Sequence, residues 1–415
     1  MNGWRGAVHL FACAIGLRVL LLHVGVGDQL GWRVETATPA NSLLGVREGL
    51  THAQHGISPY RGQACHTPPL VLWLHKAWAL HPTLYAVPNI AWDVLAALML
   101  LDTGRRLELY LEAAPARTSA GPAPSSTQPS FPLLLAGLYL LNPLTLALAL
   151  ATYSCPQSGL LLLAVALLLA SDWSLAEHPD APCLPGMRQG LSWLWAVPMR
   201  LRPAVTPHLS KQSTLGLDPL LLAPGPAAAA GQPYPNPSTP ASPHTGRCWA
   251  LHVYQLPLLV EDIQPNIGQL WYFFTQMFPQ YLAFFRFVTH SLSAVMVVPL
   301  ALRFPRRPLL LFTAQCITAA MWKPYPSVAD LALYMALLPL LRPQLRRMQT
   351  GVLLAGSFLL LAVLEPAMWH QWVEVESANS NFYYSITLLL GAWHVLLLVQ
   401  LLLLTVQVEG STKPA

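Results

Sequence analysis

Cysteine and histidine are the side chains with which this chain would do covalent chemistry or hold a metal ion, and neither is arranged for it. The six cysteines lie at positions 13, 65, 155, 183, 248 and 316. None of them forms a CxxC pair, and no set has the spacing of zinc ligands. Cys65 and His66 are neighbours on a proline-rich turn, but adjacency along the chain does not place an imidazole against a thiol. The sequence therefore predicts no catalytic residue, no metal site and no cofactor.

Asn379, Ser380 and Asn381 are suited instead to non-covalent binding. Their amide and hydroxyl groups donate and accept hydrogen bonds without fixed charge, which suits sugar hydroxyls and phosphate oxygens. Phe382 and Tyr383 follow directly and would pack beside a ligand at a membrane surface. The alternative is structural, with Asn or Ser capping the helix that follows and the aromatic residues forming part of an interfacial belt.

Residues 261–278 form another candidate, a polar turn followed by a dense aromatic run. Pro265 and Asn266 are a turn signal. Aromatic residues with polar edges favour the membrane–water interface, so we predict a short interfacial helix at the lip of a membrane cavity. Trp271 and Phe274 would then cover acyl chains or a hydrophobic peptide. The alternative is interfacial packing without a ligand.

The elements that carry these candidates belong in a bilayer. Of 415 residues, 54% are hydrophobic and only 10% are charged, which leaves too little polar surface for a soluble globule of this size. The net charge of +5 is small and spread over several loops, so it gives no case for nucleic acid. We expect an all-α, polytopic membrane protein.

Apolar runs of about 20 residues are long enough to cross a bilayer. We predict spans at 7–26, 84–101, 281–302 and 382–404, and two spans joined by a short turn within 131–170. The runs at 309–322 and 328–341 are short and flank a proline kink. Broken segments of this kind are tolerated at membrane depth where they line a protein cavity. The apolar run at 351–364 leads into a further polar loop.

Charged residues inside these runs need partners, because an isolated charge in a bilayer is costly. We expect Arg18 to face a neighbouring helix, and Asp93 to face protein and be paired or protonated. Lys323 and Asp330, seven residues apart around the kink, are expected to form an ion pair.

The basic clusters orient the chain, because positive residues favour the cytosolic side. They predict an N-terminal membrane region at 1–170 with a luminal loop at 27–69. A C-terminal membrane region at 251–405 has luminal segments at 261–280 and 365–381, and residues 406–415 form a cytosolic tail. Residues 171–250 are rich in proline and alanine and show no confident span, so we interpret them as disordered or mistranslated sequence.

Several strings carry a resemblance to a known family. They are RVE at 33–35, SPYRG at 58–62, LNPLT at 141–145, DIQPNIGQLWYFFTQMF at 262–278, KPYPSVADLALYMALLP at 323–339 and SANSNFYYSITL at 377–388. Together they resemble the phosphatidylinositol-glycan class U family over residues 1–170 and 251–405.

The resemblance implies a fold related to the GT-C polytopic glycosyltransferases, with luminal interfacial helices. It also implies a noncatalytic subunit of the GPI transamidase of the endoplasmic reticulum membrane. The implied partners are the other subunits, including a caspase-like catalytic one, the GPI lipid and the C-terminal hydrophobic signal of the proprotein. Asn379, Ser380, Asn381, Phe382, Tyr383, Pro265, Asn266, Trp271 and Phe274 are the candidate lipid-binding residues.

Two alternatives remain open. One is a dolichol-phosphate-dependent mannosyltransferase, a class that resembles this chain in the loop before SPY and carries a pair of acidic residues in its first luminal loop. Here the corresponding stretch at 34–40 reads VETATPA, in which Glu35 is the only carboxylate, and the next one is Glu48, so this acid–base machinery is missing. The other alternative is an inactive splice or gene-model form of the same subunit, which the composition of 171–250 favours.

Overall fold

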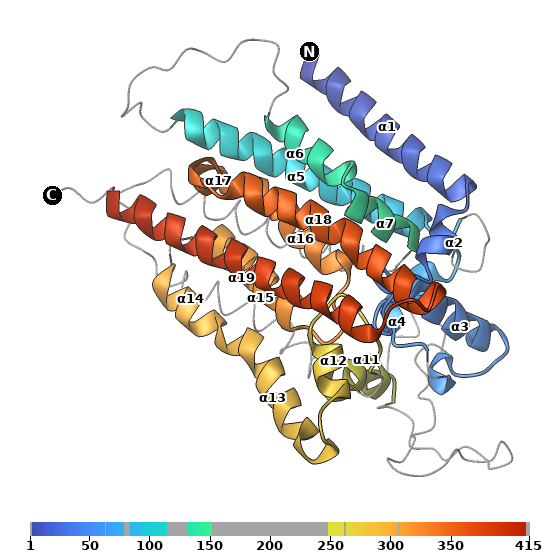
Figure 1. Ribbon diagram of the computed structural model, residues 1–415. Helices are drawn as coiled ribbons and strands as arrows, with labels where there is room; N and C mark the ends of the chain where they lie inside the picture. The colour runs from blue at the N-terminus through green and yellow to red at the C-terminus, as the bar shows by residue number, and fades with distance from the viewer. Residues whose placement is uncertain are drawn as a thin grey trace, which may run out of the picture.

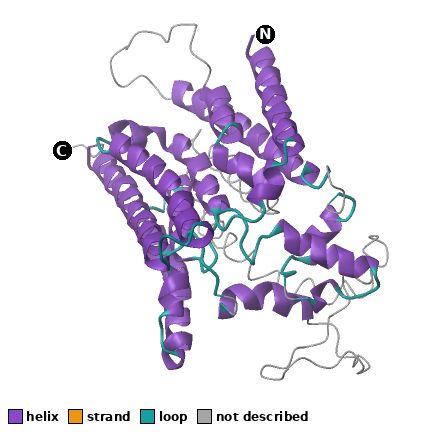
Figure 2. Ribbon diagram, turned by 45° about the vertical axis from the view of Figure 1, so that its right-hand side comes forward, coloured by secondary structure: helices purple, strands orange, loops and turns teal. Residues whose placement is uncertain are grey.

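The described part of the chain is built from helices. The computed structural model describes residues 2–62, 64–78, 84–113, 131–151, 248–260, 263–305 and 307–411. Every regular element among them is helical (Figure 2), which confirms the all-α prediction. Residues 171–247, most of the proline- and alanine-rich stretch, lie outside the described residues.

The N-terminal elements run from the first helix to a bent pair. They are α1 (Asn2–His23), α2 (Val26–Leu30), α3 (Leu43–Gln54), the 3₁₀ helix η1 (Pro59–Arg61), α4 (Pro69–His75), α5 (Val87–Ala113), α6 (Phe131–Leu140) and α7 (Pro143–Ala151). The predicted loop at 27–69 thus contains helices of its own.

The C-terminal elements begin after the proline- and alanine-rich stretch. They are α11 (Cys248–Leu259), α12 (Leu270–Thr275), α13 (Pro279–Val295), α14 (Val297–Arg303), α15 (Pro308–Trp322), α16 (Val328–Leu337), η3 (Leu338–Leu341), α17 (Arg342–Arg347), α18 (Gly351–Trp369), the π-helix η4 (His370–Glu374) and α19 (Ser380–Ser411).

Four helical stretches among the described residues are long and apolar enough to cross a membrane. They are Arg5–His23, Pro279–Arg303, Gly351–Glu374 and Ser380–Gln407. They confirm the predicted spans at 7–26, 281–302 and 382–404, and the protein is a multi-pass membrane protein. The long helix α5 covers the predicted span at 84–101 but also carries charged residues, and it is not among the four.

One boundary differs from prediction, and one predicted range is only partly described. α6 and α7 are bent by 48° at residues 141–142, where Pro143 follows and lacks the N–H that would continue the helix. As a pair they count as one broken span within the predicted range 131–170, and residues 152–170, where the second span is predicted, lie outside the described residues. α18 continues past the predicted end at residue 364 to Trp369. It can do so because Glu365 is buried and hydrogen-bonded within the protein rather than exposed in a loop.

The long helices lie side by side in one bundle (Figure 1). One core cluster joins α15, α16, α18 and α19 through residues such as Ile317, Tyr334 and Leu397. A second places Ala97 of α5 against Leu337 of α16. The two halves of the sequence therefore share a core, with α16 contributing to both clusters.

The charges inside the bundle are paired. Nε and Nη2 of Arg18 lie 3.1 and 2.8 Å from Oδ2 of Asp93, with both side chains almost fully buried. The Tyr139 hydroxyl donates to the other oxygen of Asp93 at 3.2 Å. The expectations that Arg18 faces a helix and that Asp93 is paired are confirmed, and the two residues prove to be partners.

The proline kink between α15 and α16 is held by the predicted ion pair. Nζ of Lys323 lies 2.9 and 3.0 Å from the two oxygens of Asp330. Ser327 and Asp330 also form a capping box at the start of α16, which satisfies free backbone N–H groups there. The Val328 N–H donates to the carbonyl of Glu35 at 2.9 Å, so the kink also fixes the 27–69 loop.

Candidate lipid-binding site

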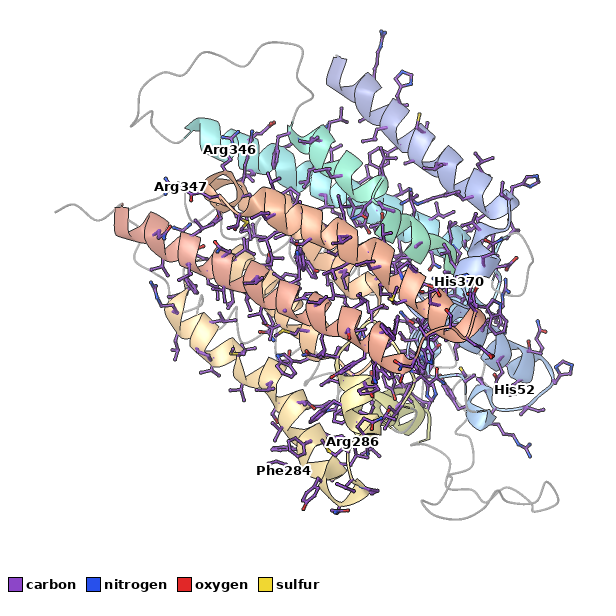
Figure 3. All side chains as sticks on the ribbon, viewed as in Figure 1. His52, Phe284, Arg286, Arg346, Arg347 and His370 are labelled. Carbon is purple, nitrogen blue, oxygen red and sulfur yellow. The ribbon has the colours of Figure 1, made fainter. Side chains whose placement is uncertain are left out.

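The three polar and aromatic segments predicted to be luminal meet at one end of the bundle. His52 and His370 mark this end in Figure 3, while Arg346 and Arg347 lie at the opposite end. Nη1 of Arg33 lies 3.7 Å from Oε1 of Glu374, which joins the 27–69 loop to η4. The basic and the polar-aromatic segments thus lie at opposite ends of the described bundle, as the orientation argument expects.

Pro265 and Asn266 belong to a turn that is held by protein contacts. Nδ2 of Asn266 donates to the carbonyls of Gln264 and Pro324 at 3.1 and 3.2 Å, and Oδ1 accepts from the Gly268 N–H at 2.8 Å. Asn266 is 2% exposed. Its amide is therefore occupied in fastening this turn to the kink, and the structure does not offer it to a ligand.

Trp271 lies in a cluster of six rings that we call the aromatic cluster. Its members are Trp271, Tyr272, Trp369, Trp372, Tyr383 and Tyr384. The Trp271 ring stacks on Trp372 with centroids 6.1 Å apart, and Tyr272 stacks on Tyr384 at 4.4 Å. Trp271 is 5% exposed. The short helix α12 is thus confirmed, but its tryptophan packs against α19 and η4.

Phe274 faces away from this cluster into a core. It is 2% exposed and packs with Leu256, Leu270 and Tyr325. The packing alternative therefore describes Phe274 better than contact with an acyl chain, because almost none of its surface is accessible.

The Asn379 to Phe382 segment is the accessible part of the predicted site. Asn379 and Asn381 are exposed and Ser380 is half-buried. Oδ1 of Asn379 accepts a hydrogen bond from the N–H of Asn381 at 3.0 Å, which is the contact that an N-cap side chain makes. The Tyr272 hydroxyl donates to Oδ1 of Asn381, so both predicted segments contribute to one surface. Phe382 is 55% exposed beside it.

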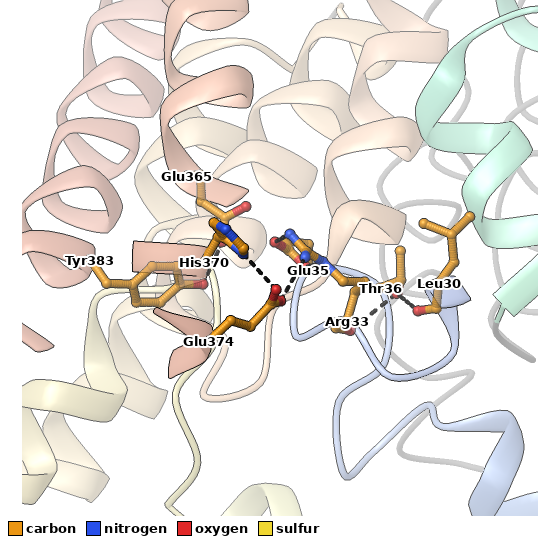
Figure 4. Close-up of polar contacts among 8 residues, drawn as sticks. All are labelled: Leu30, Arg33, Glu35, Thr36, Glu365, His370, Glu374 and Tyr383. Carbon is orange, nitrogen blue, oxygen red and sulfur yellow. Dashed lines mark hydrogen bonds and ion pairs between the residues drawn. The ribbon is translucent and has the colours of Figure 1, made fainter. Parts of the chain in front are cut away.

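Tyr383 points inward, where it touches a buried group of charged residues that we call the carboxyl centre: Arg33, Glu35 and Glu365 (Figure 4). Tyr383 is fully buried and donates to Oε1 of Glu365. Glu35 and Glu365 line the same pocket together with Arg33, so two carboxyl groups and one guanidinium meet here.

Arg33 provides the positive charge of the carboxyl centre. Its Nε and Nη2 lie 3.2 and 2.9 Å from the two oxygens of Glu35. Burial of the guanidinium opposes its charge, but the hydrogen bond and charge of Glu35 outweigh this and raise the pKa of Arg33. Arg33 therefore stays charged, and it holds both oxygens of Glu35.

A cavity of about 240 Å³ opens beside the carboxyl centre. Its walls come from α2, α7, α16, α18, α19 and the turn at Ile267, and most of its lining is apolar. The carboxyl centre and Thr36 form its polar end. This is the kind of site, apolar with a few convergent polar groups, that binds small molecules.

The sequence analysis did not assign the carboxyl centre to the site. It noted Glu35 only as a lone acid, and it placed Glu365 at the start of a loop. A signal was present, because Glu365 directly follows a 14-residue apolar run, and an ionisable residue in a membrane segment is a functional candidate by default.

Cys65 is not poised as a nucleophile. The side chain is fully buried, and burial raises its pKa to about 11. The thiol is therefore protonated at neutral pH, whereas nucleophilic attack requires the thiolate.

The fold and this end of the bundle define a multi-pass helical membrane protein with an acidic, ligand-sized cavity. The family described as "GPI transamidase subunit PIG-U" matches residues 12–197 and 244–390. The chain belongs to this family. The match includes residues 171–197 and leaves out 198–243, so it divides the stretch interpreted above as aberrant.

Curated relatives agree with the family. The chain is 27% identical to "GPI-anchor transamidase component PIGU" of Homo sapiens, over 94% of this chain and 91% of the relative. It is 28% identical to the protein of the same name in Mus musculus, over 93% and 90%. It is 26% identical to "GPI transamidase component GAB1" of Saccharomyces cerevisiae, over 92% and 89%.

Proposed function

We propose that this chain is a noncatalytic membrane subunit of GPI transamidase in the endoplasmic reticulum, and that it helps bind the GPI lipid or the hydrophobic attachment signal. The observation that carries the lipid-binding part is the contact between Tyr272 and Asn381. It joins two segments 109 residues apart into one accessible surface.

This surface has the chemistry that a glycolipid needs. The amides of Asn379 and Asn381 are exposed and retain donors for sugar hydroxyls and phosphate oxygens. Phe382 supplies exposed apolar area beside them, where an acyl chain or a hydrophobic peptide would lie. Asn266, Trp271 and Phe274 support the surface from behind and are not themselves its contact residues.

The catalytic step belongs in this proposal to a caspase-like partner subunit. Glu35 and Glu365 do form a carboxyl pair, which the mannosyltransferase alternative would need. However, both oxygens of Glu35 accept hydrogen bonds from Arg33, and Glu365 accepts one from Tyr383. A general base must be directed at the proton that it removes, whereas these carboxyl groups are held by protein partners, so the geometry favours a binding role.

Site-directed photocrosslinking tests the lipid contact. The full chain would be expressed in cells that lack their own family subunit, with a photoreactive phenylalanine analogue at Phe382 and the lipid labelled through its inositol. Val352 is the matched control, because it is 86% exposed and lies at the N-terminal end of α18, away from the Asn381 surface. We expect a lipid adduct at position 382 and little at 352.

Co-purification of the other transamidase subunits is measured in the same cells, so that assembly and lipid contact are read separately. Equal labelling at both positions in an assembled complex would show only bulk lipid and would contradict the proposed site. An adduct of position 382 with the proprotein signal, rather than with labelled lipid, would assign the surface to the peptide.

A further inference from the structure

We propose that the cavity beside the carboxyl centre binds an aliphatic chain that ends in a protonated amine. This goes beyond the proposed function, because it concerns an interior cavity rather than the exposed Asn381 surface, and it does not require the ligand to be the GPI lipid.

The walls of the cavity are suited to a hydrocarbon chain. Leu144, Ile267, Leu331, Phe358, Leu361 and Ile386 contribute apolar side chains from five separate segments. A volume of about 240 Å³ exceeds the roughly 150 Å³ of an engineered apolar cavity that takes one benzene. Lipid tails are about as apolar as leucine side chains, so an alkyl segment can pass from the bilayer to these walls without a cost in polarity.

The polar end selects the head of the ligand by charge. Arg33 lines the cavity beside Glu35 and Glu365, and it also lies 3.7 Å from Glu374, which in turn contacts His370. Two carboxyl groups and one guanidinium therefore line the cavity itself. An anionic head such as a fatty-acid carboxylate would be repelled here.

An ammonium group would complement the two carboxyl groups. Its N–H groups would donate hydrogen bonds to Glu35 and Glu365, which both line the cavity. Charge-assisted hydrogen bonds of this kind are about twice as strong as neutral ones. A chain with an alcohol head would lack the charge and bind more weakly.

Photolabelling of the purified full chain in phosphatidylcholine nanodiscs tests the proposal. The probes are three twelve-carbon chains with a mid-chain diazirine and an amine, alcohol or carboxylate head, used at pH 7, where the amine is protonated. Mass spectrometry maps the label on peptides from α16 and α18. We expect about tenfold more labelling by the amine than by either other probe, competed by unlabelled dodecylamine.

Three variants separate the cavity from the protein surface. Glu365→Gln keeps an acceptor for Tyr383 but removes the carboxylate, and should abolish the preference for the amine. Ala362→Phe fills the cavity from α18 and should reduce labelling by all probes. Asp28 is exposed and is not among the residues that line the cavity, so Asp28→Asn should leave labelling unchanged and shows that the assay tolerates loss of a carboxylate.

Equal labelling by the three probes, or an amine preference that survives Glu365→Gln in a protein that elutes as a single folded species, would overturn the proposal. Once selectivity is shown, adding phosphatidylethanolamine to the nanodiscs identifies the source of the amine. If phosphatidylethanolamine reduces labelling by the amine probe, the ligand of the cavity is a bulk bilayer lipid. If labelling is undiminished, the ligand is a scarcer amine-bearing chain. Either result supports selection for the ammonium group.

Discussion

The hydroxyl of Tyr383 donates a hydrogen bond to Oε1 of Glu365, across the interface between α19 and α18. Tyr383 is also a member of the aromatic cluster, where its ring lies 5.2 Å from Trp369 and 6.0 Å from Trp271. The contact therefore connects the aromatic cluster, which supports the accessible Asn381 surface, to the carboxyl centre of the interior cavity.

Tyr383→Phe should destabilise the protein, because it leaves a buried carboxyl group without its donor. The expected cost is about 1.5–3 kcal/mol, the range for a hydrogen bond to a charged group. The midpoint of thermal unfolding of the full chain in nanodiscs measures it. Tyr384→Phe is the control, because it keeps the ring that stacks on Tyr272. Equal midpoints for wild type and Tyr383→Phe would show that this contact is not formed.

Breaking the Arg18–Asp93 pair should be more damaging. Removing one partner of a buried ion pair costs about 3–5 kcal/mol, because the other charge is left unpaired. We expect Arg18→Ala and Asp93→Ala each to lower the yield of folded protein in detergent size-exclusion chromatography, and Arg18→Met with Asp93→Leu to recover part of it. Arg5→Ala, exposed on the same helix, is the control. Single variants that each give as much folded protein as the wild type would contradict the pairing.

Gly268→Ala should disturb the turn that carries Asn266. A Cβ atom at this position would lie 2.5 Å from Cγ of Pro326 and 3.0 Å from Oδ1 of Asn266. Overpacking of this kind costs about 1–3 kcal/mol. Gly356→Ala is a matched control within α18, where a Cβ meets nothing within 4 Å and alanine favours the helix by about 1 kcal/mol. Thermal unfolding should order the proteins as Gly356→Ala, wild type, Gly268→Ala; the reverse order would refute this packing.

Cys65 should resist alkylation until the solution is strongly alkaline. Burial raises its folded pKa to about 11, above the value of about 8.5 in an unfolded chain. The stability that this shift contributes is therefore complete below about pH 8.5 and is lost as the pH rises toward 11. Mass spectrometry after iodoacetamide at pH 8 should find Cys65 intact in the folded protein and modified after unfolding in guanidinium chloride. Rapid labelling of Cys65 in folded protein at pH 8 would be inconsistent with its burial.

The sequence alone was sufficient for the class of fold and for the meeting of the two aromatic segments at one end. Apolar run length predicts helices such as α1 and α19, and charge distribution predicts which loops share a side. Residue-level roles were harder to predict. Asn266 and Phe274 look like contact residues in the sequence, yet their partners lie at Pro324 and Tyr325, which only the tertiary fold brings near.

The carboxyl centre shows more clearly that residue roles set by the tertiary fold cannot be predicted from local sequence. Glu35 and Glu365 are 330 positions apart, and no local pattern links them. Their pairing depends on the 27–69 loop being fixed to the kink through Val328 and on α18 extending past Pro366. Both conditions are long-range, so a search for a local acidic pair in the first loop could not find this one.

Complementation of cells that lack their own family subunit tests the central claim most directly. The full chain would be expressed in these cells, with GPI-anchored proteins at the surface scored by flow cytometry and the transamidase subunits by co-purification. We predict restored surface anchoring by the wild-type chain, and a strong reduction by Asn381→Ala with assembly intact. A well-expressed chain that neither restores anchoring nor co-purifies with the other subunits would contradict the account, and would favour the inactive form of the subunit.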